Sequence, residues 1–152
     1  MIVMLRHSPA DIARRVIIEL GGGTDPQQPA ASQSATAWPV FAEGQPDKPD
    51  SAVMVFSQEG ILEGRHMIDG SWAEHKGVQI LIRAANHSNG FARVELIVGI
   101  LDAMYQQVMT LGAYRYLVWS FSRRGQPIPL GNEAGTNRKM FSLNYLMNVQ
   151  AL

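Results

Sequence analysis

The residues of this sequence best suited to chemistry gather in one stretch, 58–76, which reads QEGILEGRHMIDGSWAEHK. His66, Asp69, Glu74 and His75 are of the types that bind divalent metals, and such a site would serve a metal-dependent hydrolase. They lack the helical spacing of a zinc protease, and the chain has no cysteine to complete a zinc site. Residues of these types in a polar segment are more often solvated. We therefore predict no metal, no cofactor and no catalytic residue, and keep the hydrolase as an alternative.

Other chemical motifs are missing or misplaced. The sequence has no P-loop, no dinucleotide fingerprint and no G-x-S-x-G elbow. GGGT at 21–24 comes after a predicted helix, so its amides do not join a helix N-terminus to bind phosphate. Arg123 and Arg124 could contact a phosphate or a carboxylate, but a charged hairpin tip is the usual role of such a pair.

Composition narrows the class of protein further. The 152 residues carry a formal net charge of zero, which disfavours a role driven by phosphate contacts. Charged residues make up only 17 %, which is typical either of a surface partly covered by partners or of chance in a small protein. No apolar run reaches membrane-spanning length, and MIVMLRHSPAD lacks the features of a signal peptide. We expect one domain, 1–152, that stays in the compartment where it is made.

The pattern of apolar and turn residues predicts the order helix, two strands, long loop, strand, helix, two or three strands. Ser8 and Pro9 begin the first helix, and glycines 21–23 end it. Ser88 caps the second helix, which continues to Gly112. The predicted strands cover 38–41, 52–57, 77–84, 114–123, 127–130 and 140–149. The residues between the first helix and the first strand, 21–37, indicate a flexible connection.

The predicted fold class is α+β, with a mainly antiparallel sheet, two helices packed on one face and one long interface loop. In the last strand Phe141, Leu143, Tyr145, Met147 and Val149 share one face. The helices would cover that face, and no helix is left for the other.

The loop at 58–76 has no periodicity but many apolar residues, and it has two interpretations. It packs on its own domain, or it is an arm that inserts into a neighbouring subunit. Trp72 is the better interface tryptophan, because Trp38 and Trp119 fall in predicted strands and should be core. The candidate interface comprises Arg65, His66, Met67, Ile68, Asp69, Trp72, Arg123 and Arg124.

The sequence resembles the tail terminator proteins of long-tailed bacteriophages, also described as minor capsid or tail completion proteins. The resemblance spans nearly the whole chain. It rests on SPADIARRVIIEL, WPVF, GVQILIRAANHS, ILDAMYQQV, YRYLVWSF and above all PIPLGNEAGTNRKMFSLNYLM.

The resemblance implies a structural protein without enzymatic activity that forms a hexameric ring on the last ring of the tail tube. Such a ring stops tube polymerisation and meets the head-side connector, at the neck of a virion assembled in the bacterial cytoplasm. DNA would pass through its lumen without specific binding, and no membrane is involved. A head-closure protein or a tail tube protein is the structural alternative.

Overall fold

The computed structural model of the chain describes residues 5–27, 38–65, 67–68 and 72–152. Over these residues it has two helices and seven strands, in an α+β fold as predicted. The elements are α1 Pro9–Glu19, β1 Val40–Ala42, β2 Ala52–Arg65, β3 Trp72–Ala84, α2 His87–Ala103, β4 Gln107–Leu111, β5 Tyr114–Arg123, β6 Ile128–Asn132 and β7 Lys139–Ala151. None of the described helices is long and apolar enough to span a membrane.

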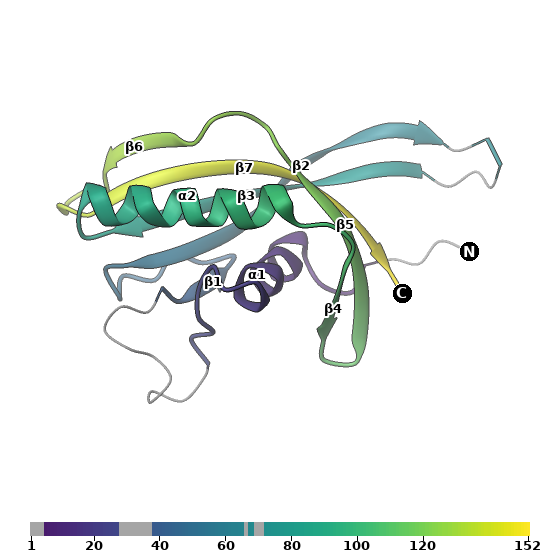
Figure 1. Ribbon diagram of the computed structural model, residues 1–152, viewed down its shortest axis with the longest axis horizontal. Helices are drawn as coiled ribbons and strands as arrows, with labels where there is room; N and C mark the ends of the chain where they lie inside the picture. The colour runs from purple at the N-terminus through teal and green to yellow at the C-terminus, as the bar shows by residue number, and fades with distance from the viewer. Residues whose placement is uncertain (1–4, 28–37, 66, 69–71) are drawn as a thin grey trace.

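The strands form one sheet in the order β1-β2-β3-β7-β5-β4, and β6 also pairs with β7. The sheet is strongly curled (Figure 1) and mostly antiparallel. Its described parallel pair is β1 with β2. Strand β7 pairs with β3 along one edge and with β6 and then β5 along the other, so it lies at the centre of the hydrogen-bonded network.

Helix α1 begins and ends as the sequence predicts. The Ser8 hydroxyl accepts a hydrogen bond from the Asp11 amide at 3.1 Å, and Pro9 occupies the first turn. At the other end the Gly22 amide donates to the Ile17 carbonyl at 2.8 Å, while Gly21 has a φ of +86°. This is a Schellman ending, which needs a residue that tolerates positive φ. Local chemistry therefore accounts for the predicted ends of α1, and at the first turn the Ala10 amide also donates to the Ser57 hydroxyl at 3.2 Å.

The predicted bounds of the second helix are wrong at both ends. Asn86, not Ser88, is its cap, and the Asn86 side chain accepts from the Asn89 amide at 2.9 Å. The helix ends at Ala103 instead of continuing to Gly112. The segment QVMTL carries apolar residues that fit either period, and pairing with β5 makes it strand β4.

Both helices contribute side chains to one buried cluster with the inner residues of the sheet. In β7 these are Phe141, Leu143, Tyr145 and Met147, at most 3 % exposed, as the predicted alternation requires. Trp38 belongs to the cluster too, as predicted. Trp119 does not: it is half-buried at an irregularity in the β5–β7 pairing and donates to the Gln150 side chain at 3.2 Å.

Helix α2 lies against β3, β5 and β7, and Figure 1 shows it running alongside β7. A Cβ on Gly90 would come within 2.5 Å of the Phe141 ring and 3.0 Å of the Ala84 Cβ. Glycine therefore sets the spacing between α2 and the sheet. Gly99 in the same helix has nothing within 4 Å of its Cβ position.

These two glycines give a matched test of the packing. Gly90→Ala should lower the free energy of unfolding by about 1–3 kcal/mol, because the added methyl overpacks a closed core. Gly99→Ala should raise it by up to about 1 kcal/mol, since alanine only improves helix propensity there. Urea unfolding of both variants measures the difference, and equal effects would contradict the packing.

Candidate assembly surfaces

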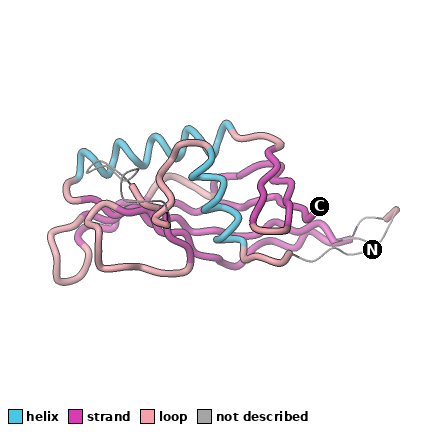
Figure 2. The backbone as a smooth tube through the Cα atoms, turned by 90° about the horizontal axis from the view of Figure 1, so that it is seen from below, coloured by secondary structure: helices cyan, strands magenta, loops and turns pink. Residues whose placement is uncertain are grey.

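The described residues of the segment predicted as a long loop, 58–76, instead form the outer part of a hairpin. Strands β2 and β3 continue their pairing from Gln58↔Gly77 outward to Arg65↔Trp72. Strand β7 pairs with β3 only as far as Lys76, and β1 pairs with β2 only at Val53–Val55. Residues 58–76 are called the arm below. The arm projects past the rest of the sheet in both views (Figures 1 and 2).

The sequence of the arm hid its strands because the pairing register shifts twice, once between Gln58 and Ile61 and once between Leu62 and Gly64. Each shift breaks the alternation by which strands are detected. Two glycines allow the first shift. A Cβ on Gly60 would lie 2.0 Å from the His75 carbonyl oxygen, and one on Gly77 would lie 2.3 Å from that of Glu59. The two backbones thus approach more closely than side chains permit.

The arm presents large apolar side chains to solvent. Ile61 is 42 % exposed and Leu62 is 58 % exposed, while Met67 and Ile68 are fully exposed. Among the predicted interface residues, Arg65 and Trp72 oppose each other in the hairpin ladder. His66 and Asp69 lie outside the described residues. The structure therefore places the exposed apolar residues of the candidate interface at the far end of the arm.

A metal site is not formed by the part of the chain that the structure covers: no group of three or more histidine, aspartate or glutamate residues is gathered there. Two members of the considered set, His66 and Asp69, are outside that part. Glu74 and His75 belong to β3.

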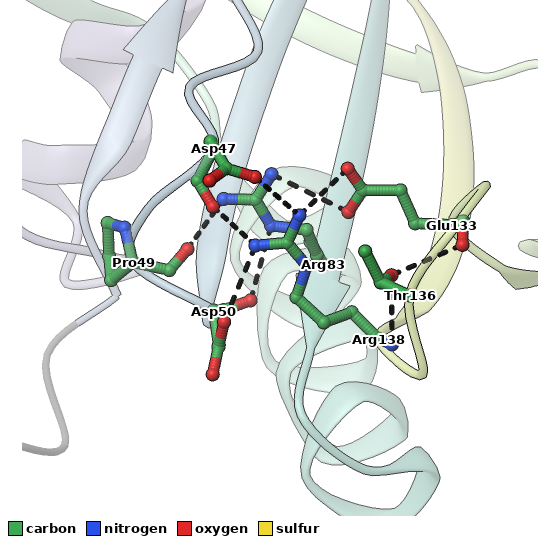
Figure 3. A network of polar contacts seen from close by, with 7 residues as sticks. All are labelled: Asp47, Pro49, Asp50, Arg83, Glu133, Thr136 and Arg138. Carbon is green, nitrogen blue, oxygen red and sulfur yellow. Dashed lines mark hydrogen bonds and ion pairs between the residues drawn. The ribbon is translucent and has the colours of Figure 1, made fainter.

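The sequence analysis missed a buried polar cluster on the second face of the sheet. Arg83, in β3, is completely buried, and it donates to the carbonyl oxygens of Pro49 at 2.5 Å and Asp50 at 3.3 Å. Arg138 donates to the carboxylates of Glu133 at 3.0 Å and Asp47 at 3.2 Å (Figure 3). In the sequence, this cluster is indicated only by Arg83, a charged residue at a strand position between the apolar Ile82 and Ala84.

This cluster covers part of the sheet face opposite the hydrophobic core cluster. Met54, Met140 and Ser142 are buried there although they lie outside the helix-covered core cluster. The two guanidinium groups join the segment 46–50 to the turn 133–138. One end of the second face is thus covered by the chain itself.

In this cluster burial lowers the pKa values of the two arginines, and the neighbouring carboxylates raise them. Burial, followed by the nearby charge of Arg138, lowers the pKa of Arg83, while Glu133, at 3.6 Å, opposes the change. For Arg138 burial acts in the same direction, but hydrogen bonding to Asp47 and the charge of Glu133 leave its pKa raised. Glu133 is paired with both guanidiniums, at 3.6 Å from Arg83 and 3.0 Å from Arg138, so removing either one takes away part of its counter-charge.

Arg123 and Arg124, the other predicted interface residues, differ in environment. Arg123 lies 3.5 Å from Asp102, whose carboxylate also accepts from the Tyr145 hydroxyl at 3.1 Å. Burial and then the charge of Asp102 raise the pKa of Tyr145. Asp102 stands in the last turn of α2, where the helix dipole disfavours an acid, and Arg123 offsets this. Arg124 is exposed.

Comparison with known proteins gives the family. Residues 16–151 match the family described as "Bacteriophage tail terminator protein". Because the match covers most of the chain, the chain belongs to the bacteriophage tail terminator family, a family of structural proteins of the phage tail. No curated protein matches the sequence. One solved structure is similar over 91 % of this chain and 94 % of its own, at 18 % identity and a TM-score of 0.44.

The buried cluster predicts a large effect of one substitution. Arg83→Met should lower the free energy of unfolding by about 3 kcal/mol, because it leaves two carbonyl oxygens without their buried donor and takes one of two counter-charges from Glu133. Arg15→Met is the matched control. Its ion pair with Glu19, at 2.7 Å, is half-exposed, and its loss should cost about 0.5 kcal/mol or less. Similar losses in urea unfolding would contradict the role of Arg83.

Proposed function

We propose that the chain forms a closed ring, a homo-hexamer, on the head-proximal end of the tail tube. The ring stops tube polymerisation and offers its other side to a head-side connector or stopper protein. Membership of the tail terminator family is the observation that carries this proposal. The position of the ring at the neck, its stoichiometry and its two partners are parts of the same proposal.

The arm supports assembly on independent grounds. A two-stranded ribbon is at best marginally stable alone in water, because it buries too little apolar surface. This one also exposes Ile61, Leu62, Met67 and Ile68. A neighbouring subunit that covers these side chains would supply the missing burial. A contact between an arm and a different surface of the next subunit is head-to-tail, and it closes into a ring when the rotation allows.

The predicted site residues take their places in this proposal. Arg65, His66, Met67, Ile68, Asp69 and Trp72 belong to the arm and lie between subunits. Arg124 is exposed and available to the tube or the connector, while Arg123 holds Asp102 within its own subunit. The lumen lets DNA pass without specific binding. The zero net charge and the engagement of Arg83 and Arg138 in ion pairs support this.

The alternatives make different physical predictions. A tail tube protein would repeat its ring contacts into long tubes, and a head-closure protein would not cap tubes. A metal-dependent hydrolase acting through His66 and His75 would purify with stoichiometric metal and lose it with activity on chelation. The family match favours the terminator.

A double substitution at the end of the arm tests the proposal. Wild-type protein should run as a closed ring in light scattering and electron microscopy, and it should shorten tubes when added to polymerising tail tube subunits. Met67→Ser combined with Ile68→Ser should shift the ring towards monomer, since interface anchors contribute about 2 kcal/mol or more each. Both side chains are fully exposed, so the change takes nothing from the core of the subunit.

Leu96→Ser, on the exposed side of α2 at 44 % exposure, is the control and should leave the ring intact. A wild-type chain that stays monomeric with and without tubes, or that grows long tubes alone, would refute the proposed function. Rings that tolerate the double substitution would refute the role of the arm only.

A further inference from the structure

The edges of the sheet differ in how they are protected from pairing with another strand. The edge at β1 is closed by Thr24, whose amide donates to the Trp38 carbonyl and whose carbonyl accepts from the Val40 amide, both at 2.9 Å. Strand β6 contains Pro129, which has no backbone N–H to donate and therefore hinders strand addition. Two of the three edges of the body of the sheet are thus blocked within the described residues.

Strand β4 is the edge without such protection. Its sequence, QVMTL, has no proline and no charged residue, and its pairing with β5 has no irregularity. Natural edge strands usually carry a lysine, a proline or a bulge, because an open row of backbone groups invites another strand. Apolar side chains are exposed next to this edge, namely those of Tyr105, Val108 and Tyr114. An open edge with an apolar border is typical of a strand-addition site.

The arm offers a strand of the matching kind. Past Val55, the described strands pair with β2 on one side only, so the other side of Gln58–Leu62 faces away from β3. Ile61 and Leu62 supply exposed apolar side chains, and Glu59 supplies an exposed acid. Arg115, which is exposed and paired with Thr110, lies beside β4. The two surfaces therefore agree in apolar character and charge, and the register shifts of the arm centre its regular backbone on Ile61 and Leu62.

We propose that the β2 side of the arm, around Gln58–Leu62, pairs with the free edge of β4 in the neighbouring copy of this chain. The inference rests on the ring under Proposed function and names its contact. Arm and edge are different surfaces. Every subunit therefore binds one neighbour through its arm and the other neighbour through its β4 edge, which is the head-to-tail arrangement of a ring. The pairing extends the sheet of one subunit by the ribbon of the next.

The absence of cysteine makes a direct test simple. The double variant Leu62→Cys, Val108→Cys is assembled and treated with a short bismaleimide, and the products are separated in a denaturing gel. A ladder of covalently linked chains is expected, because the contact holds thiols of neighbouring subunits at about millimolar effective concentration. The control, Leu62→Cys with Leu130→Cys, places the second thiol on β6 at similar exposure, 50 % against 47 % at Val108. It should give at least about tenfold less ladder at micromolar protein.

A charge placed on the edge gives the second test. Val108→Lys should turn rings into monomers without changing the circular dichroism spectrum, whereas Leu130→Lys on β6 should leave rings intact. Rings that survive Val108→Lys and give no ladder would overturn the arm-to-edge contact while leaving the proposed function standing. Rings that survive Val108→Lys but no longer cap tubes would assign the edge of β4 to the tube protein. That result would also overturn the arm-to-edge contact. Protein that is monomeric in every form, with no ladder, would overturn both proposals.

Discussion

Strand β7 is the part of the structure on which the other elements depend. It is hydrogen-bonded to β3 on one edge and to β6 and β5 on the other, so both halves of the sheet are joined through it. Its inner side chains reach the core beneath the helices, and Phe141 sets the distance of α2 through Gly90. Tyr145 fixes the end of the same helix through Asp102. A slip of one residue in β7 would turn its apolar face outward and break all of these contacts.

The other face of β7 explains why a structural protein keeps two arginines in a buried position. Burying guanidinium groups is costly, and apolar residues of the same volume would often be at least as stable. Arg83 and Arg138, however, satisfy carbonyl and carboxylate groups of two segments far apart in the sequence, 46–50 and 133–138. The cluster thus holds these two segments together.

The sequence predicts those elements whose signals are local. The cap at Ser8, the glycine ending of α1 and the alternation in β7 each depend on a few neighbouring residues, and the structure follows all three. The predictions of secondary structure were wrong where pairing with a distant segment determines the conformation. QVMTL became a strand because β5 lies beside it, and the arm escaped detection because two register shifts break its alternation. The contacts that Arg83 makes in its cluster span at least 33 positions, which no single-sequence pattern reveals.

The sequence indicates the position of the arm but not its form, for the same reason. The excess of apolar residues at 58–76 is a compositional signal, and it marked the segment that protrudes from the sheet. Its form as a ribbon, and the open edge at β4, depend on the completed sheet. Together they give a physical reason for association: the ribbon lacks burial, and the edge lacks hydrogen-bond partners within the described chain.

Amide hydrogen exchange of the arm tests this account most directly. It should be measured for Gln58–Leu62 and for the buried residues of β7, in dilute subunits and in assembled protein. The account predicts fast exchange of the arm amides in dilute subunits and strong protection after assembly, while the β7 amides stay protected in both. Arm amides that exchange at the same rate in both states would contradict this prediction, because a neighbouring subunit would then not stabilise the ribbon.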